Sequence, residues 1–220
     1  MNTSQTLADR VAAFEAEAAA QLPAEALQAF RAERKLQGER PPGAGAAVGS
    51  PMPDGDLLDV HGNPTTLAAV RAGAPAVLVF YRGAWCPYCN LTLRAYQETL
   101  LPELHARGVA LIALSPQKPD GALTAQETNE LQYPVLSDPG NLLAGGLGIL
   151  TETGAAAQQV QAQFGIDVAA TNVDATGAIP MPTVVLLDAA GTIRWIDVHP
   201  DYGTRTEPVE ILKHLADLAG

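Results

Sequence analysis

The chain has 220 residues, which is enough for a single α/β domain that carries an additional segment. Apolar residues make up 47% of it and charged residues 17%, a globular composition that excludes wholesale disorder. Its 13 basic and 24 acidic residues give a formal charge of −11, which repels phosphate backbones and anionic lipids, so neither nucleic acid nor a membrane is an expected partner.

Two stretches before about residue 37 repeat apolar residues at helical spacing, and each predicts a helix. The members are Leu7, Val11, Phe14 and Ala18 in the first stretch, and Ala26, Leu27 and Phe30 in the second. Residues 38–56 are so rich in Gly and Pro that they predict a connector. We expect residues 1–49 to form a helical arm with its linker and residues 50–220 to form the main domain. The apolar stripe of the arm leaves two uses open, a homodimer contact and packing on its own chain.

The main domain alternates predicted strands and helices, which is typical of an α/β fold. A short extended piece turns at residues 61–63, and a long insertion at 151–179 is expected to shape a site or an interface. Strands are expected at 76–81, 109–115, 134–136, 183–188 and 192–197, with the last two joined as a hairpin at 189–191. Helices are expected at 67–72, 87–107, 122–131, 155–164 and 207–218.

The chain's two cysteines, Cys86 and Cys89, form a CxxC motif at the point where a buried strand passes into a helix. With Pro87 at the first helical position, Cys86 is expected near the N-cap and Cys89 in the first turn. Unpaired backbone N–H groups and the helix dipole stabilise an anion there, which lowers the pKa of a thiol. The motif therefore predicts a redox-active dithiol.

Two structural interpretations compete with redox chemistry: half of a zinc site, and a pair of buried inert thiols. Zinc needs about four ligands, whereas the histidines are scattered at His61, His105, His199 and His214. Two glycine-rich stretches, 43–45 and 145–148, lack the further residues of dinucleotide- and phosphate-binding loops. We therefore expect no metal and no cofactor.

The expected location is the cytoplasm. The longest apolar stretch, around residues 74–81, is interrupted by Pro75 and is far shorter than the roughly 20 residues of a spanning helix. The opening residues MNTSQTLADR lack the basic end, apolar core and cleavage site of a secretory signal. In that compartment a pair of cysteines favours catalysis over a structural disulfide.

The stretch WCPYC at residues 85–89 resembles the thioredoxin-superfamily active site, and MPT at 181–183 resembles the cis-proline turn that faces it. From about residue 50 onward the chain is most similar to the peroxiredoxin-like branch of the alkyl hydroperoxide reductase and thiol-specific antioxidant group. The shared stretches are FYRG at 80–83, LSDPG at 136–140, DY at 201–202 and EP at 207–208. The resemblance implies a thioredoxin-like three-layer α/β sandwich with a central mixed sheet, with Pro182 cis.

The same resemblance implies site residues. It places Cys89 at the peroxidatic position, Cys86 at the usual Thr or Ser, Arg82 at the usual Pro, and Met181 where the family has an Arg. Arg82 is the candidate replacement cation, with a solvated strand-end arginine as the alternative reading. The supporting residues expected are Arg82, Trp85, Pro87, Pro182 and Thr183. The polar stretch 199–202 is interpreted as a structural corner, with an approach to the site from the C-terminal side as the alternative.

The expected function is a thiol peroxidase that reduces hydroperoxides through a dithiol–disulfide cycle. In it Cys89 forms a sulfenic acid and Cys86 condenses with it. The alternative enzyme is a disulfide reductase in which Cys86, at an exposed N-cap, attacks a partner disulfide. A redox-sensing module without turnover is the third alternative. Thioredoxin, glutaredoxin or glutathione-type thiols are the expected electron donors.

Overall fold

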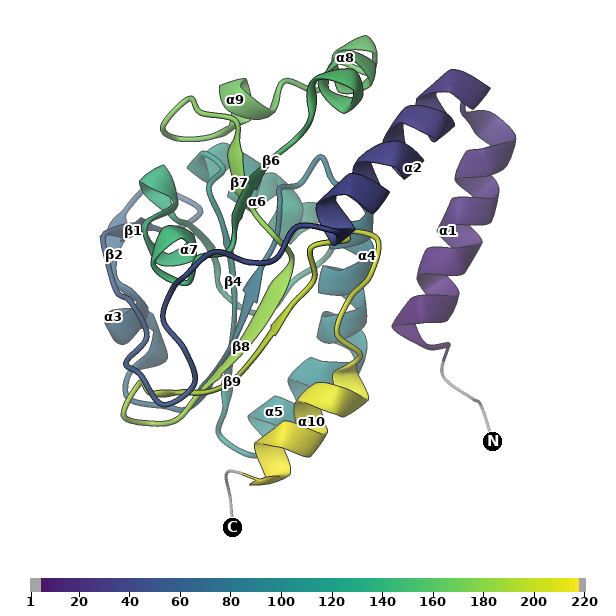
Figure 1. Cartoon of the computed structure of the whole chain (residues 1–220). Coiled ribbons are helices and arrows are strands. Elements are labelled where there is room, and N and C mark those ends of the chain that lie inside the picture. Colours follow the sequence, from purple (N-terminus) through teal and green to yellow (C-terminus); the bar gives the residue numbers. More distant parts are fainter. Residues whose placement is uncertain (1–4, 218–220) are drawn as a thin grey trace.

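A seven-stranded mixed sheet forms the centre of the computed structural model, which describes residues 5–217 (Figure 1). The strand order is β2-β1-β5-β4-β3-β8-β9; β3 runs parallel to β4 and antiparallel to β8. The sheet strands are β1 (Leu57–Leu58), β2 (Pro64–Thr65), β3 (Ala76–Phe80), β4 (Ala110–Ser115), β5 (Val135–Ser137), β8 (Thr183–Leu187) and β9 (Ile193–Val198). A separate two-stranded ladder pairs β6 (Leu150–Glu152) with β7 (Ala178–Pro180).

Helices cover both faces of this sheet, and the alternation of side chains along the strands explains why. In β3, Val77 and Val79 join the core on one face while Leu78 and Phe80 join the core on the other, so both faces are apolar. The first face is covered by α4 (Pro87–Ala95), α5 (Leu101–His105), α6 (Pro119–Thr128) and α10 (Pro208–Asp217), and the second by α3 (Leu67–Arg71) and α7 (Leu142–Gly146). This confirms the expected sandwich with its central mixed sheet.

The helix expected at 87–107 is present but changes its winding in the middle. A π-helical segment, Tyr96–Leu100, joins α4 to α5. Tyr96 is fully buried there, and its hydroxyl donates to the carbonyl of Thr206 at 2.7 Å. This bond ties the middle of the helix to the loop that precedes α10.

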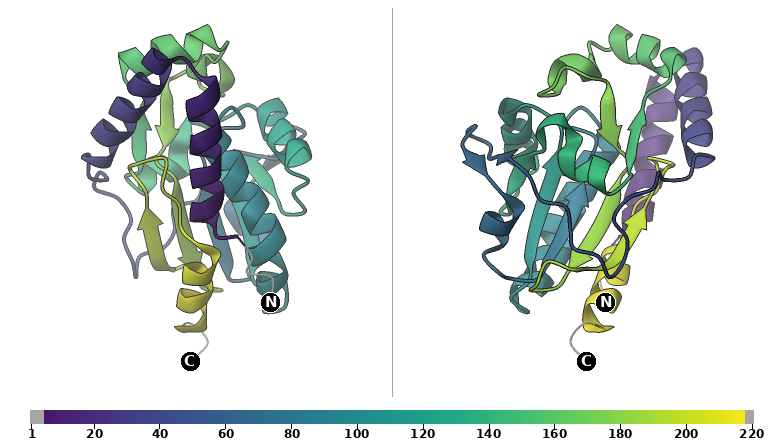
Figure 2. Two further views of the ribbon diagram at one scale, coloured as in Figure 1. Left: turned by 90° about the vertical axis from the view of Figure 1, so that its right-hand side faces the viewer. Right: turned by 60° about the vertical axis from the view of Figure 1, so that its left-hand side comes forward.

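Helices α1 (Leu7–Gln21) and α2 (Ala24–Gly38) pack on their own chain. Figure 2 shows α1 beside α4, and α2 crossing toward α8 (Ala155–Gln163). Leu7 is buried in the core, and the backbone N–H groups of Leu7 and Ala8 donate to the Glu207 carboxylate at 3.1 and 2.8 Å. Of the two uses left open for the apolar stripe, packing on the same chain is the one observed.

The connector after α2 lies against a glycine-rich turn of the main domain. The N–H of Gly43 donates to the carbonyl of Gly148 at 2.7 Å, and that of Ala46 to the carbonyl of Gly146 at 2.8 Å. A Cβ placed on Gly45 would lie 2.1 Å from the carbonyl carbon of Leu147. Only glycine allows this approach of two backbones, so the connector is held in place.

The remaining predicted elements are confirmed within a few residues. The helix expected at 122–131 runs from Pro119 to Thr128, α8 occupies the expected helix of the insertion, and a short α9 (Val168–Thr171) follows it. The last helix is confirmed as far as Asp217, and its predicted end at residue 218 lies outside the described residues. Within 5–217, no helix has both the length and the apolar character needed to cross a membrane.

The prediction that Pro182 is cis is wrong, because every peptide bond of the described chain is trans. Between β7 and β8, the N–H of Met181 donates to the carbonyl of Ile149, and the carbonyl of Pro182 accepts from the N–H of His199. The chain makes no tight turn at Pro182, and both of these backbone hydrogen bonds form with a trans peptide.

Candidate active site

The first turn of α4 holds both cysteines as the sequence predicts. Cys86 is the N-cap, with extended backbone angles of φ −91° and ψ 111°, and Pro87 is the first helical residue. The carbonyl of Cys86 accepts from the N–H groups of Cys89 and Asn90, both at 3.1 Å. These bonds place the two sulfurs on neighbouring positions of one helical turn.

The two cysteines are not joined by a disulfide in this structure, and both are buried, each residue being only 1% exposed. The expectation of an exposed N-cap cysteine is therefore wrong. The reason is that α1, α2 and Trp85 lie over the start of α4 and enclose a cavity that Cys86 lines. Within residues 5–217, no three side chains of His, Cys, Asp or Glu are grouped to hold a metal ion.

The two thiols differ in acidity because their environments differ. Burial raises the pKa of Cys89, but the hydrogen bond from Cys86, the Arg205 guanidinium, and the backbone N–H and charge of Arg82 together lower it to about 5. Burial and the hydrogen bond to Cys89 raise the pKa of Cys86 well above its ordinary value. The geometry thus puts the thiolate on Cys89 and keeps a proton on Cys86.

Arg205 is a site residue that the sequence did not reveal. Its Nη2 lies 3.5 Å from the sulfur of Cys89, and its Nη1 donates to the carbonyls of Tyr202 and Thr204. Met181, which stands where the family pattern has an arginine, is buried in the core on the other face of the sheet. The sequence did hold one indication of this role, because Arg205 lies between DY at 201–202 and EP at 207–208, the two C-terminal stretches that carry the family resemblance.

Arg82 is a buried cation rather than a solvated one, being 4% exposed. Its guanidinium lies 3.9 Å from the ring centre of Tyr202 and 5.0 Å from that of Trp85, and its Nη2 donates to Thr153 at 3.3 Å. Among the described residues it forms no salt bridge, and its Nε has no hydrogen-bond partner. A buried cation without a carboxylate is available to a thiolate or to an anionic ligand.

In the loop before Cys86, the indole of Trp85 folds back over Gly83. A Cβ on Gly83 would lie 2.4 Å from the indole Nε1, so the close approach requires glycine here. Asn90 donates to the carbonyl of Ala84 at 2.8 Å and fixes the same loop to α4. Trp85 therefore lies beside Cys86 in the wall of the cavity.

A second, much smaller space lies on the Cys89 side. Its volume is about 10 Å³, room for a group about the size of one water. Pro182, Thr183 and Arg205 line it together with Cys89. The segment before β8 thus faces the site even though its proline is trans.

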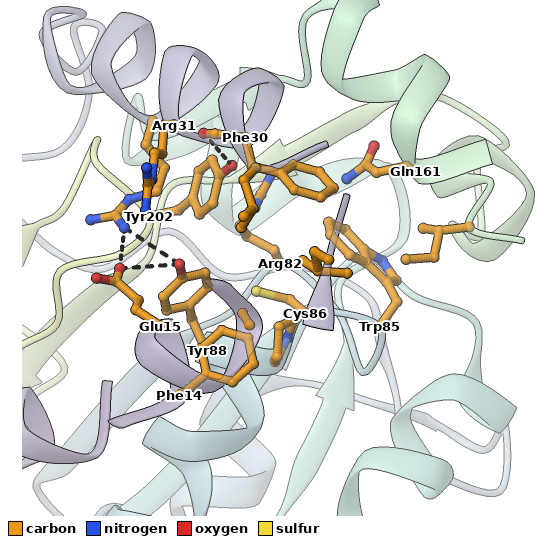
Figure 3. A pocket seen from close by; sticks show the side chains of 16 residues that line it. Phe14, Glu15, Phe30, Arg31, Arg82, Trp85, Cys86, Tyr88, Gln161 and Tyr202 are labelled. Carbon is orange, nitrogen blue, oxygen red and sulfur yellow. Dashed lines mark hydrogen bonds and ion pairs between the residues drawn. The ribbon is translucent and has the colours of Figure 1, made fainter. Parts of the chain in front are cut away.

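The larger cavity, of about 170 Å³, lies between the arm helices and the start of α4 (Figure 3). Cys86 lines it, whereas Cys89 does not. Apolar side chains of the arm provide much of its wall: Phe14, Ala18, Leu22, Leu27 and Phe30. The chain thus offers two separate approaches, one to each sulfur.

Polar contacts fasten α2 over this cavity. Arg34 donates from Nε and Nη2 to the Asp201 carboxylate at 2.8 and 3.1 Å, and from Nη1 to Glu15 and the hydroxyl of Tyr88. Tyr202, which the sequence assigned to a structural corner, lines the cavity and packs against Tyr88. The arm and the loop before α10 therefore build the site together.

The comparisons with known proteins agree with this fold. Two provisionally named peroxiredoxins from two strains of Mycobacterium tuberculosis are 31% identical over 91 residues, which is 41% of this chain and 57% of theirs. The matched part thus spans little more than half the length of these curated relatives.

Solved structures share the architecture at low identity. The peroxidoxin BcpB from Mycobacterium tuberculosis is 20% identical, with a TM-score of 0.58 over 79% of this chain and 97% of its own. A thiol peroxidase from Chromobacterium violaceum is 16% identical, with a TM-score of 0.62 over 81% and 91%. The model of the AhpC/TSA family matches residues 48–196, more than half of the sequence. The chain therefore belongs to the AhpC/TSA family.

Proposed function

We propose that this protein reduces hydroperoxides through a dithiol–disulfide cycle in which Cys89 attacks the peroxide and Cys86 resolves the product. The observation that carries the proposal is the guanidinium of Arg205 at 3.5 Å from the sulfur of Cys89, in a setting that lowers the pKa of that thiol. A thiolate is the nucleophile that such a reaction needs.

The first step makes a sulfenic acid. The Cys89 thiolate attacks one peroxide oxygen, an S–O bond forms, the O–O bond breaks, and the departing alkoxide takes up a proton. In this proposal the cations of Arg205 and Arg82, which act on the Cys89 thiol, also stabilise the negative charge that develops on the departing oxygen, the role that the family's missing Arg would otherwise fill. Pro182 and Thr183 border the small space from which the peroxide would reach Cys89.

The second step makes the disulfide. Cys86 gives up its proton to the departing hydroxyl as its sulfur attacks the sulfur of the sulfenic acid, so that an S–S bond forms, the S–O bond breaks and water leaves. The existing hydrogen bond between the two thiols already places them in contact. Two equivalents of an external thiol then restore the dithiol.

Trapping the sulfenic acid tests the assignment. In Cys86→Ser, where a hydroxyl replaces the resolving thiol, we expect peroxide to leave a sulfenic acid on Cys89 that a dimedone probe captures. In Cys89→Ser we expect no capture. Sulfenic acid on Cys86 instead, or on neither residue, contradicts the proposal.

The alternatives make different predictions for turnover. A disulfide reductase would reduce insulin, and its first contact would be Cys86, which lines the larger cavity; the burial of both thiols opposes a protein substrate. A redox-sensing module would form the disulfide once and consume no further peroxide in the presence of a recycling thiol. The proposal also keeps three expectations from the sequence. The protein acts in the cytoplasm, residues 1–49 form an arm distinct from the main domain at 50–220, and two copies form a homodimer.

A further inference from the structure

The larger cavity reaches the cysteine that does not attack the peroxide. Its wall includes Cys86, and Figure 3 shows this side chain among those that line the cavity. Cys89, with the ionised sulfur, borders the small space on the other side. A molecule held in the larger cavity therefore meets the sulfur that keeps its proton in the dithiol and becomes half of the disulfide after oxidation.

The charges of the cavity favour an anionic occupant. Its lining includes three arginines, Arg31, Arg34 and Arg82, against one carboxylate, Glu15, in a chain whose formal charge is −11. Arg34 is paired with Glu15 and Asp201, but Arg82 forms no salt bridge among the described residues and its buried Nε lacks a partner. A carboxylate on the occupant would satisfy this buried donor.

The size and cover of the cavity favour a small molecule over a protein. About 170 Å³ is available beneath the arm helices, and each cysteine is only 1% exposed. The arm helices that form the wall stand between Cys86 and a protein thiol, whereas a space of this size beneath them suits a small molecule. The apolar side chains of α1 and α2 suit its carbon skeleton.

We propose that this cavity binds an anionic low-molecular-weight thiol, which reduces the Cys86–Cys89 disulfide by attacking the sulfur of Cys86. The inference rests on the proposed function, because that function generates the disulfide. It assigns a reductant site to the arm, and names carboxylate-bearing thiols of the glutathione kind as the class of donor.

The exchange steps balance. The thiolate of the small molecule attacks Sγ of Cys86, a new S–S bond forms there, and the Cys86–Cys89 bond breaks with its electron pair on Cys89. Cys89 is the better leaving group, because a thiol of lower pKa leaves faster. A second thiol then attacks the small molecule's sulfur in the mixed disulfide, which frees Cys86 to take up a proton and releases the small-molecule disulfide.

Re-reduction of the full-length disulfide form tests the proposal. The disulfide is made with diamide, so no peroxide is needed, and is then mixed with glutathione, neutral 2-mercaptoethanol or cationic cysteamine. At intervals, the free thiols of the protein are alkylated and counted by intact mass. The rate of disulfide reduction by each reagent is then divided by the fraction of that reagent present as thiolate. We expect the glutathione rate to saturate with concentration and to exceed the cysteamine rate.

Two variants sharpen the test. Arg31→Gln removes an exposed cation from the cavity rim, and should slow reduction by glutathione by about two- to fivefold while leaving 2-mercaptoethanol unchanged. Arg40→Gln removes an exposed arginine that follows α2 and does not line the cavity, and should change neither rate.

Other results overturn the inference. Equal normalised rates for the three thiols without saturation, or equal glutathione rates in the Arg31 and Arg40 variants, would show that no anion site is used. Faster reduction by a reduced thioredoxin than by glutathione would assign the donor to a protein. These results leave the peroxide step untouched, whereas failure of diamide to join Cys86 and Cys89 removes both proposals.

Discussion

Arg205→Gln perturbs the contact that holds the Cys89 thiolate. The substitution removes a guanidinium whose Nη2 is 3.5 Å from the sulfur. A hydrogen bond to a charged group contributes about 1.5–3 kcal/mol, and one pKa unit corresponds to about 1.4 kcal/mol. We therefore expect the pKa of Cys89 to rise by about 1–2 units above its value of about 5.

The ultraviolet absorbance of the thiolate during a pH titration of the reduced protein measures this shift. At pH 6, a pKa near 5 leaves about 90% of the thiol ionised, whereas a pKa of about 6–7 leaves about 10–50%. The ionised fraction should therefore fall about two- to ninefold at pH 6. It should differ little between the two proteins near pH 9.

A matched control separates the local contact from overall charge. Arg194→Gln removes the same charge from an exposed arginine that pairs with Asp188 at 2.7 Å. We expect that variant to titrate like the wild type. An unchanged pKa of Cys89 in the Arg205 variant, or an equal shift in the control, refutes the role given to Arg205.

Three further predictions concern packing, access and pH. Gly83→Ala places a Cβ 2.4 Å from the Trp85 indole, so it should cost about 1–3 kcal/mol in denaturant unfolding and change the tryptophan fluorescence; unchanged values for both count against the tight loop. Arg34→Gln removes the bidentate pair with Asp201 and so loosens the packing of α2 over the thiols. Iodoacetamide should therefore modify the thiols faster in this variant than in Arg40→Gln. Equal rates would mean that the pair between Arg34 and Asp201 does not hold α2 over the site. The pKa of Cys89 is depressed in the folded state, so ionisation of this thiol adds to the unfolding free energy. That contribution is full above the unfolded pKa near 8.5 and is lost as pH falls toward about 5. The difference in unfolding free energy between wild type and Cys89→Ser should therefore grow with pH across that window, and a difference that does not change with pH contradicts the depressed pKa.

The layers of the fold could be predicted because their signals are local. Continuous runs of apolar residues mark β3 and β4, and proline and glycine mark where elements stop. The placement of Cys86 at an N-cap followed from Pro87 one residue later. Such features depend on neighbours in the chain, which the sequence displays directly.

The rest of the site depends on contacts between distant segments, and no pattern in one sequence specifies these. Arg205 meets Cys89 across 116 positions, through a loop whose course is set by the bond between Tyr96 and Thr206. The burial of Cys86 likewise depends on how α1 and α2 dock, and the apolar stripe of the arm allowed more than one partner. The trans form of Pro182 follows from pairing on both sides of it, which resemblance to a motif did not reveal.

The close backbone contact between the connector and residues 146–148, here called the glycine seam, limits how two copies of this protein can associate. Domain swapping of α1 and α2 would break the bonds of Gly43 and Ala46, and each swapped connector would have to rebuild the same backbone approach on another molecule. The seam therefore favours a closed protomer that carries its own cover. Without such a swap, each copy in a homodimer would keep the cavity formed by its own arm.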